Sequence, residues 1–557
     1  MMKENIRNIL VLSALCYIFF IFGNSILSLT YPDEVFYTQT AVEMVQHKTW
    51  MTPYLFGQPQ FEKPIFLYWL MRIAFIIFGV NSFSARFFPA LFGTIGVIAI
   101  YLLCVIGFKD KRKAMLSSLI LMSSGLYIGL SRTVFTDMIF SVFILLALLF
   151  FFWGYAREKW KGLSILLFFI FCACAVLSKG PLGLFIPIIV VFIFLALRKD
   201  FNFRFSGYAF WGFILFLLIS LPWYILMIKK YGSAFTDEFF VNDHLRRLIE
   251  AEHFSADTWY FYPGSMIMGM FPWSLYVFIS LGLLFKDAWK KTEPIYAFLI
   301  SWIGVVFLIF QPAHSKLASY IFPMFPALAI VAGDFICDAV SLKKHERALQ
   351  LASLITLLII VFFTLSLVVG VFAFHSYILK YLSSKIPIYL LILLFALQAG
   401  FFYLKLRRRE FFKCAYALML FVPIIFSVIP LIAKDIEPQL SLKDTCDYLL
   451  KNYKVEGTIA ASKVFVRGIR YYSNKDVAIM NPHGKNFFSP HPITFLDTDK
   501  KVADFLRSQP VTYCVFKKKT SIEDIQRQGE EFNIEILKHI GNQYIVRVTP
   551  KERGGNK

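Results

Sequence analysis

The sequence has little charge, since only 17% of its 557 residues are Asp, Glu, Lys or Arg and 58% are hydrophobic. In soluble domains, about a quarter of all residues are charged. The shortage therefore excludes a water-soluble globule, and it also excludes a disordered chain or a coiled coil. The mean hydropathy is +0.63, and the apolar residues form runs of about 20, enough to cross about 30 Å of hydrocarbon as helices. The sequence predicts a polytopic α-helical membrane protein.

Acidic residues are scarce, with 36 Asp and Glu against 57 Lys and Arg, and the net charge is +21. In a soluble protein this excess would indicate nucleic-acid binding. Here the basic residues gather in short loops such as 108–113, 155–162 and 405–413, where the orientation of membrane insertion explains them. We therefore expect no nucleic-acid partner and a multi-pass membrane protein with a cytoplasmic N-terminus.

Cysteine is also rare, and the eight cysteines follow no metal-ligand or disulfide-framework spacing. Six lie in apolar segments, whereas Cys446 and Cys514 lie in the polar tail, where the sequence does not decide whether they pair. The first apolar block, Ile9 to Leu29, lacks a small-residue cleavage site, so we interpret it as a retained first span.

The apolar blocks predict about 13 spans, and an odd number places the two termini on opposite sides of the membrane. The predicted spans lie near residues 9–29, 84–107, 113–131, 136–155, 163–178, 181–198, 207–228, 265–285, 295–311, 317–340, 350–373, 386–405 and 411–433.

Three regions on the predicted outer side are too long for turns. Residues 30–84 contain a helical pattern from Asp33 to about His47, and residues 229–264 contain another around 236–252; both should lie along the membrane surface. The tail has alternating runs at 458–461, 511–516 and 543–548, typical of a small α/β domain. We therefore divide the chain into a transmembrane domain, 1–433, and a soluble domain on the outer side of the membrane, 434–557.

Charged residues gather at the outer ends of the predicted spans and leave the span centres nearly free. A transporter would place its key charges at mid-membrane, in broken helices. An enzyme that handles a substrate at the outer leaflet fits this pattern better, because charged groups near a membrane are costly unless they are functional or paired. The outer residues that carry chemistry are Asp33, Tyr37, Gln60, Glu62, Lys63, Asp137, Lys179, His244, Arg246, Arg247, Lys316 and Tyr320.

Each of these signals also has a purely structural explanation. Asp33 suits the first turn of a helix, and Asp137 suits a helix cap. Glu62 and Lys63 could form a solvated ion pair. Lys316 and Tyr320 are four residues apart, which predicts one shared helix face. It is the joint occurrence of these groups on one side of the membrane that favours a catalytic site.

In this order, the motifs resemble the ArnT group of aminoarabinose transferases that act on lipid A, within the GT-C class of glycosyltransferases. The resemblance rests on Asp33-Glu34 with Tyr37, FEKP at 61–64, TDM at 136–138, LSKGPLG at 177–183 and SKLASYIFP at 315–323. It covers the whole chain and implies a GT-C fold with 13 spans and a periplasmic C-terminal α/β domain. One departure is Gln60, where the group commonly has Tyr, and this leaves the sugar open.

The resemblance implies roles for individual residues. Asp33 would be the principal catalytic carboxylate with Tyr37 beside it, and Asp137 a second acidic residue. Lys63, with Arg247 or Arg246, would bind the donor phosphate. Gln60, Lys179, Lys316 and Tyr320 would line the same cavity. Glu62 and His244 are candidate ligands of a divalent metal ion, and no other cofactor is implied.

The implied reaction moves a sugar, such as 4-amino-4-deoxy-L-arabinose, from a polyprenyl-phosphate donor to a lipid A phosphate, with inversion. The alternatives are a GT-C transferase for galactosamine, galacturonic acid or mannose, or for core oligosaccharide or protein as the acceptor. A lipid-linked sugar transporter without chemistry, or an inactive relative, are further alternatives.

Overall fold

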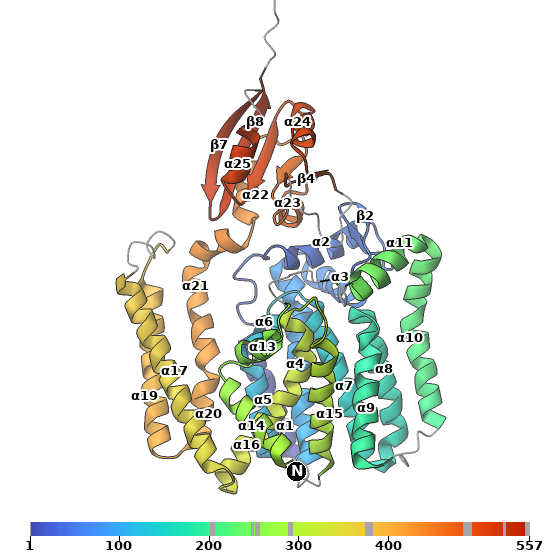
Figure 1. The fold of residues 1–557 in the computed structure, drawn as a ribbon, viewed down its shortest axis with the longest axis vertical. Helices are drawn as coiled ribbons and strands as arrows, with labels where there is room; N and C mark the ends of the chain where they lie inside the picture. The colour runs from blue at the N-terminus through green and yellow to red at the C-terminus, as the bar shows by residue number, and fades with distance from the viewer. Residues whose placement is uncertain are drawn as a thin grey trace, which may run out of the picture.

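The computed structural model describes residues 2–200, 207–246, 250, 257–287, 293–373, 382–482, 493–526 and 531–551. A bundle of helices carries a smaller domain with a β-sheet at one end, here called the capped end (Figure 1). The N-terminus lies at the opposite end of the bundle (Figure 1). The N-terminus and the C-terminal sheet are thus separated by the length of the bundle (Figure 1).

The bundle is built from long apolar helices. Nine described helices are long and apolar enough to cross a membrane, or ten if one bent pair counts as a span, so this is an integral membrane protein. The bundle helices are α1 (Met2–Cys16) with η1 (Tyr17–Ile21), α4 (Ser82–Phe108), α5 (Lys111–Met122), α6 (Gly125–Ser131), α7 (Thr136–Ala156), α8 (Lys161–Lys179), α9 (Leu182–Arg198), α10 (Gly207–Tyr231), α13 (Phe261–Gly269), α14 (Ser274–Asp287), α15 (Pro294–Phe310), α16 (Phe325–Ser341), α17 (Glu346–Ala373), α19 (Ile386–Arg407), α20 (Phe411–Met419) and α21 (Phe421–Leu440).

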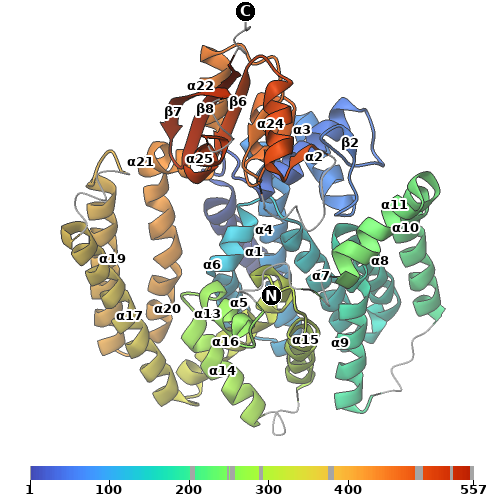
Figure 2. The same ribbon diagram turned by 45° about the horizontal axis from the view of Figure 1, so that its top comes forward.

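Every predicted span overlaps a described helix, but three of the shorter helices, α9, α14 and α15, have 17 residues or fewer. Figure 2 shows α10 and the α17–α19 pair at opposite sides of the bundle, with α9 and α15 between them. The first span is displaced from its prediction, since its helix runs from Met2 to Ile21. Asn5 and Asn8 at its start hydrogen-bond the Tyr101 hydroxyl inside the bundle, which accommodates polar residues there.

Three predicted spans are broken or altered rather than continuous. Between α5 and α6 the chain bends by 67°, where the hydroxyls of Ser123 and Ser124 donate to carbonyls of the preceding turn. Residues 265–285 are divided between α13 and α14 at Pro272, which has no N–H to continue the helix. The tenth predicted span opens with a 3₁₀ segment, η5 (Ala318–Met324), before α16 begins.

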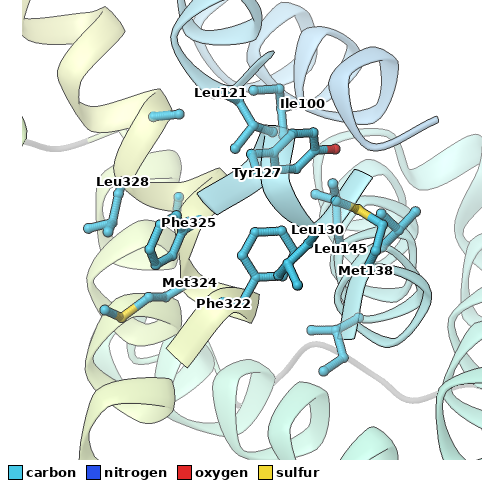
Figure 3. Close-up of a cluster of buried hydrophobic side chains, with 14 of the residues drawn as sticks. Ile100, Leu121, Tyr127, Leu130, Met138, Leu145, Phe322, Met324, Phe325 and Leu328 are labelled. Carbon is cyan, nitrogen blue, oxygen red and sulfur yellow. The ribbon is translucent and has the colours of Figure 1, made fainter. Parts of the chain in front are cut away.

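The centre of the bundle is a close-packed apolar cluster. Figure 3 shows Tyr127 and Leu130 of α6 and Met138 and Leu145 of α7 facing Phe322 of η5. The rings of Tyr127 and Phe322 are 5.6 Å apart. Gly96 lets the Tyr127 side chain pack directly against α4, because a Cβ at position 96 would lie 2.2 Å from the Tyr127 hydroxyl oxygen.

A charged cluster lies at the opposite end from the cap, and no sequence pattern had indicated it. Lys113, near the start of α5, pairs with Asp334 and with Asp338 of α16, the latter at 2.7 Å. The Tyr296 hydroxyl donates to Asp334 at 3.3 Å. Buried charges of opposite sign compensate each other here, so the cluster ties α5, α15 and α16 together.

Helix α2 (Asp33–Gln46) crosses the capped end of the bundle, as Figure 1 shows, and its bounds agree with the predicted helix. It is followed by a hairpin, β1 (Tyr54–Leu55) with β2 (Gln58–Pro59), and by α3 (Phe66–Phe78). Ten of its 14 residues are buried, and its predicted position along the membrane surface stays a prediction. The C-terminal domain covers the side that would otherwise face water.

Glu34 of α2 and Arg86 of α4 form a buried, bidentate ion pair with N–O distances of 2.8 and 2.6 Å. The Glu34 carboxylate also accepts hydrogen bonds from Thr30 and from the Val134 N–H before α7. Burial raises the pKa of Glu34, but hydrogen bonding and the charge of Arg86 outweigh burial and hold that pKa below its usual value. The remaining N–H groups of Arg86 bind the carbonyls of Asn24, Leu27 and Ser28.

The C-terminal domain confirms the predicted α/β class. Its sheet has the order β5-β4-β3-β6-β8-β7, in which β3 to β6 are parallel and β7 and β8 antiparallel. Its elements are α22 (Lys443–Asn452), β3 (Ile459–Ala461), α23 (Val466–Ser473), β4 (Val477–Met480), β5 (Phe495–Leu496), α24 (Asp499–Arg507), β6 (Thr512–Phe516), α25 (Thr520–Gln526), β7 (Phe532–Ile540) and β8 (Gln543–Pro550).

Cys446 and Cys514 do not pair. Both thiols are free and buried, and they belong to separate apolar clusters of the C-terminal domain, Cys446 with α22 and α23 and Cys514 with residues of α24 and α25. Burial raises the pKa of both thiols, so each behaves as a small apolar side chain.

The C-terminal domain is docked on the start of α2 by direct hydrogen bonds. The Tyr31 hydroxyl donates to the Gln439 carbonyl at 2.9 Å, and the Tyr472 hydroxyl of α23 donates to the Leu29 carbonyl at 2.9 Å. The Tyr31 ring also packs edge-on against Phe465 at 5.0 Å. Helix α21 runs without a break to Leu440, beyond the predicted boundary at 433, and leads directly into this interface.

We predict that Glu34→Gln lowers the free energy of unfolding by about 3–5 kcal/mol, because it leaves Arg86 buried without its counter-charge. Thermal unfolding of the purified protein in detergent measures the change. Glu4→Gln is the matched control, since Glu4 pairs with Lys111 on the exposed surface and its loss should leave the midpoint unchanged. Equal midpoints for the Glu34 variant and the wild type would contradict the role given to this pair.

Candidate active site

The first part of the candidate site lies on α2, where Asp33 and Tyr37 are one helical turn apart. Tyr37 is 6% exposed, with its ring 6.1 Å from Phe135 and 6.4 Å from Tyr68. Burial raises the pKa of Tyr37, and the charges of Asp137 and Asp33 raise it further. Two carboxylates that are distant in sequence therefore lie close to one phenol, as the predicted site requires.

Asp137 lies in the first turn of α7 and forms an ion pair with Lys179, the last residue of α8. Asp137 is not the helix cap, because that position is held by Phe135 without a side-chain hydrogen bond. The Lys179 ammonium also lies 4.8 Å from the centre of the Tyr320 ring, a cation–π distance. The structure thus joins three of the predicted residues, Asp137, Lys179 and Tyr320, in direct contact.

The second part of the site is the segment between the hairpin and α3, which carries Gln60, Glu62 and Lys63. Gln60 and Glu62 are buried and Lys63 is partly buried. Burial raises the pKa of Tyr68 of α3, and the charge of Glu62 raises it further. Since the Tyr68 ring lies beside that of Tyr37, the FEKP segment adjoins the two carboxylates.

Several buried polar atoms at this place make no hydrogen bond of normal geometry with any residue that the structure describes. They are both amide atoms of Gln60, the Tyr68 hydroxyl and the Thr136 hydroxyl. An unsatisfied buried polar group costs about 1–3 kcal/mol, and in native proteins such groups usually meet water or a ligand. Their concentration beside Tyr37 indicates a place that a polar ligand completes.

Lys316 is the next residue of the predicted site. It precedes η5 and is 5% exposed, and its ammonium binds Asp257 at 2.8 Å while the other Asp257 oxygen is 2.7 Å from His314. The prediction that Lys316 and Tyr320 share a helix face is wrong, because the chain between them is extended at Leu317 before the 3₁₀ segment begins. Tyr320 instead packs on Phe310 at 5.7 Å.

Arg246, one of the two predicted phosphate-binding arginines, is the last residue of η3 (Asp237–Arg246), a helix within the predicted segment 236–252. Arg246 is exposed and pairs with Glu250 at 2.8 Å. Arg247 lies outside the described residues, as does the side chain of His244. Their roles therefore stay predictions.

The described residues also bear on the metal prediction. In that part of the chain, no group of three or more His, Cys, Asp and Glu side chains is close enough to hold a metal ion. Glu62 faces Tyr68, and its expected companion His244 is not among the described side chains. A metal site that combines Glu62 and His244 stays a prediction.

Three residues of the site were missed by sequence reasoning. Tyr68 is an aromatic residue in an apolar stretch, indistinguishable there from a core residue. Glu34 was noted only as the neighbour of Asp33, and nothing in the local sequence separated the two acidic residues. Arg467, on α23, lies 3.9 Å from the Asp33 carboxylate; nothing in the local sequence indicated this contact.

Comparison with known proteins identifies the fold class of this chain. Residues 5–233 match the model of the family described as dolichyl-phosphate-mannose-protein mannosyltransferase. The structure resembles that of ArnT from Cupriavidus metallidurans bound to undecaprenyl phosphate, with a TM-score of 0.77 and 18% identity over 97% of both chains. The fold is therefore the GT-C fold of ArnT, which confirms the predicted fold class.

Sequence relatives agree with this fold. The chain is 30% identical over 64% of its length to undecaprenyl phosphate-alpha-4-amino-4-deoxy-L-arabinose arabinosyl transferase 2 of Proteus mirabilis, and 32% identical over 60% to an uncharacterized protein of Aquifex aeolicus. These alignments span 63% and 65% of the two relatives, less than two thirds of their length. In sequence and in fold the chain is thus ArnT-like, as the motifs indicated.

We predict that Asp137→Asn lowers the free energy of unfolding by about 3 kcal/mol or more, because Lys179 loses its partner in a largely buried place. The double variant Asp137→Asn/Lys179→Met should recover at least half of this loss, since it removes the uncompensated charge. Thermal unfolding of both variants in detergent gives the comparison. A double variant less stable than Asp137→Asn would show that the two residues do not act as a pair.

Proposed function

We propose that this protein transfers a sugar from a polyprenyl-phosphate donor to a phosphate of lipid A, and that the sugar is an amino sugar such as 4-amino-4-deoxy-L-arabinose. One observation carries the proposal. Asp33 and Asp137 both lie close enough to Tyr37 to affect its charge state, and Tyr37 adjoins the FEKP segment through Tyr68. The ArnT crystal structure of the same fold holds undecaprenyl phosphate, and relatives of this chain bear the name of the aminoarabinose transferase.

Lys63 is the proposed ligand of the donor phosphate, together with Arg247 or Arg246. When the sugar leaves, the phosphodiester of the donor becomes a phosphate monoester, so negative charge grows on its oxygens. A cation placed there stabilises the transition state more than the ground state and so accelerates the reaction. Lys63 is partly buried, and an ammonium in such surroundings interacts more strongly than it would in water.

Asp33 is proposed to orient the acceptor or to support the positive charge of an oxocarbenium-like sugar during direct displacement with inversion. A phosphate monoester has a second pKa near 6, so a lipid A phosphate is largely deprotonated already and hardly needs a general base. The half-exposed Asp33 side chain supports this role, since it can reach a substrate from α2. With a hydroxyl acceptor, Asp33 would instead serve as the base.

The surroundings of Asp137 differ from those of Asp33 and support a role in positioning. Its charge is balanced by Lys179, so it keeps its place beside Tyr37 without an excess of negative charge. An ammonium on the sugar would find carboxylates and aromatic faces together here, and both attract cations. Glu62 and His244 remain the proposed ligands should a divalent metal ion assist the donor phosphate.

A second candidate function is the transfer of another sugar, such as mannose, to a protein. The match of residues 5–233 to the mannosyltransferase family model favours it, and Gln60, in the place of the common Tyr, leaves the sugar pocket different. Mass spectrometry of lipid A from cells with and without this protein separates the two candidates, because it reports the sugar and the acceptor together.

We predict that purified protein modifies lipid A when it is given a polyprenyl-phosphate sugar, and that Lys63→Gln and Asp33→Asn each lower kcat about 10²–10³-fold. Mass spectrometry of the extracted lipid measures the product. Lys454→Gln is the control, because Lys454 lies exposed on the C-terminal domain and pairs only with Glu456 in the described structure. Full activity in the Asp33→Asn variant would remove Asp33 from the proposed mechanism.

We also propose that the protein lies in the bacterial inner membrane with its N-terminus in the cytoplasm and its capped end in the periplasm. The concentration of Lys and Arg in the loops at the uncapped end supports this orientation. Alkaline phosphatase fused after residue 557 should be active in cells, and a fluorescent protein fused before Met1 should fluoresce. The reverse pattern would invert the proposed orientation.

A further inference from the structure

The C-terminal domain brings an arginine to the candidate active site. Arg467, in the first turns of α23, has a side chain that is only 12% exposed, and its Nη1 lies 3.9 Å from an Asp33 carboxylate oxygen. Its guanidinium carbon lies 4.5 Å from the centre of the Phe36 ring, so the planar group is held over an aromatic face. The positive charge of Arg467 also lowers the pKa of Tyr68, against the raising effect of burial.

Docking of the C-terminal domain is accounted for by other residues. Tyr31, Tyr472 and Phe465 connect the domain to the chain that leads into α2. One turn beyond Arg467, Arg470 lies 3.7 Å from Glu43 of α2 and 2.8 Å from Asp476 of its own domain. Arg467 differs from all of these, because it alone among them faces the group that includes Asp33 and Tyr68.

The charges at the site explain why a cation is required in this place. Under the proposed function, a phosphate with a charge of about −1.5 to −2 must come close to the negative Asp33. Glu34 is neutralised by Arg86 and Asp137 by Lys179, so those cations are already engaged at their own carboxylates. A guanidinium beside Asp33 would offset the repulsion, and its planar set of donors matches phosphate oxygens in a bidentate manner.

We propose that Arg467 binds the phosphate of the acceptor lipid, so that the C-terminal domain takes part directly in acceptor recognition. The inference rests on the proposed function, with Lys63 as the ligand of the donor phosphate. It assigns the two phosphates to two parts of the chain, the donor phosphate to the outer loop and the acceptor phosphate to α23. The acceptor class is then an anionic phospholipid-like saccharide, and neutral hydroxyl acceptors are excluded from good binding.

The test compares Arg467→Gln with Arg467→Lys and with the control Arg470→Gln, which lies on the same helix one turn away. Arg467→Gln should raise the KM for lipid A about 10- to 100-fold, which corresponds to the loss of a charge-assisted hydrogen bond, and leave the KM for the donor unchanged. Arg467→Lys should recover part of this loss, since it keeps the charge without the bidentate geometry. The Arg470→Gln variant should keep the wild-type KM.

Binding without turnover provides the second readout. Native mass spectrometry of the full-length protein should show that the wild type prefers lipid A over dephosphorylated lipid A, that Arg467→Gln loses this preference, and that both bind undecaprenyl phosphate equally. An unchanged preference in Arg467→Gln would overturn the proposal. So would weaker undecaprenyl phosphate binding, or equal losses of lipid A binding and of thermal stability in Arg467→Gln and Arg470→Gln.

The two proposals can fail separately. A wild-type protein that transfers no sugar, but whose preference for phosphorylated lipid depends on Arg467, would overturn the proposed function and support the phosphate site. A wild-type protein that is active, together with an Arg467→Gln variant of unchanged KM for lipid A, would support the function and overturn the site.

Discussion

The buried pair between Glu34 and Arg86 is the constraint on which the candidate site depends. It joins α2 to α4, to the loop that follows the first span and to the chain before α7. Helix α2 lies across the end of the bundle and does not pass through it, so packing along a membrane span does not fix its rotation about its own axis. The ion pair fixes this rotation. Because Glu34 points into the bundle, Asp33 and Tyr37 take the positions that face the rest of the site.

Two neighbouring acidic residues thus serve different purposes because their surroundings differ. Glu34 is fully buried and fully partnered, whereas the Asp33 side chain is half exposed. A similar contrast separates Asp137, which is paired with Lys179, from Asp33, whose carboxylate lies 3.9 Å from the Arg467 guanidinium. Among these three carboxylates, Asp33 is the most exposed, and it lies beside the arginine that is proposed to bind the anionic acceptor.

Much of this architecture could be predicted from sequence, because hydropathy and period are local signals. The bounds of α2 and the strands near 459, 512 and 543 agree with the predicted segments. The breaks in the spans were missed because hydropathy does not register the Ser123–Ser124 and Pro272 interruptions of the helix. The contact of Arg467 with Asp33 could not be predicted, since it joins segments more than 400 residues apart and leaves no pattern in either of them.

The docking of the last-made domain on the first extramembrane helix has a consequence for biogenesis. Tyr31 and Asn542, which hydrogen-bond each other, are separated by 511 residues. While the chain is being synthesised, Phe36 and Glu43 of α2 lack their contacts with Arg467 and Arg470 until nearly all later helices have been inserted and the C-terminal domain has formed, because domains mature in the order of their emergence. A nascent or truncated chain would thus leave this face of α2 uncovered at the membrane surface.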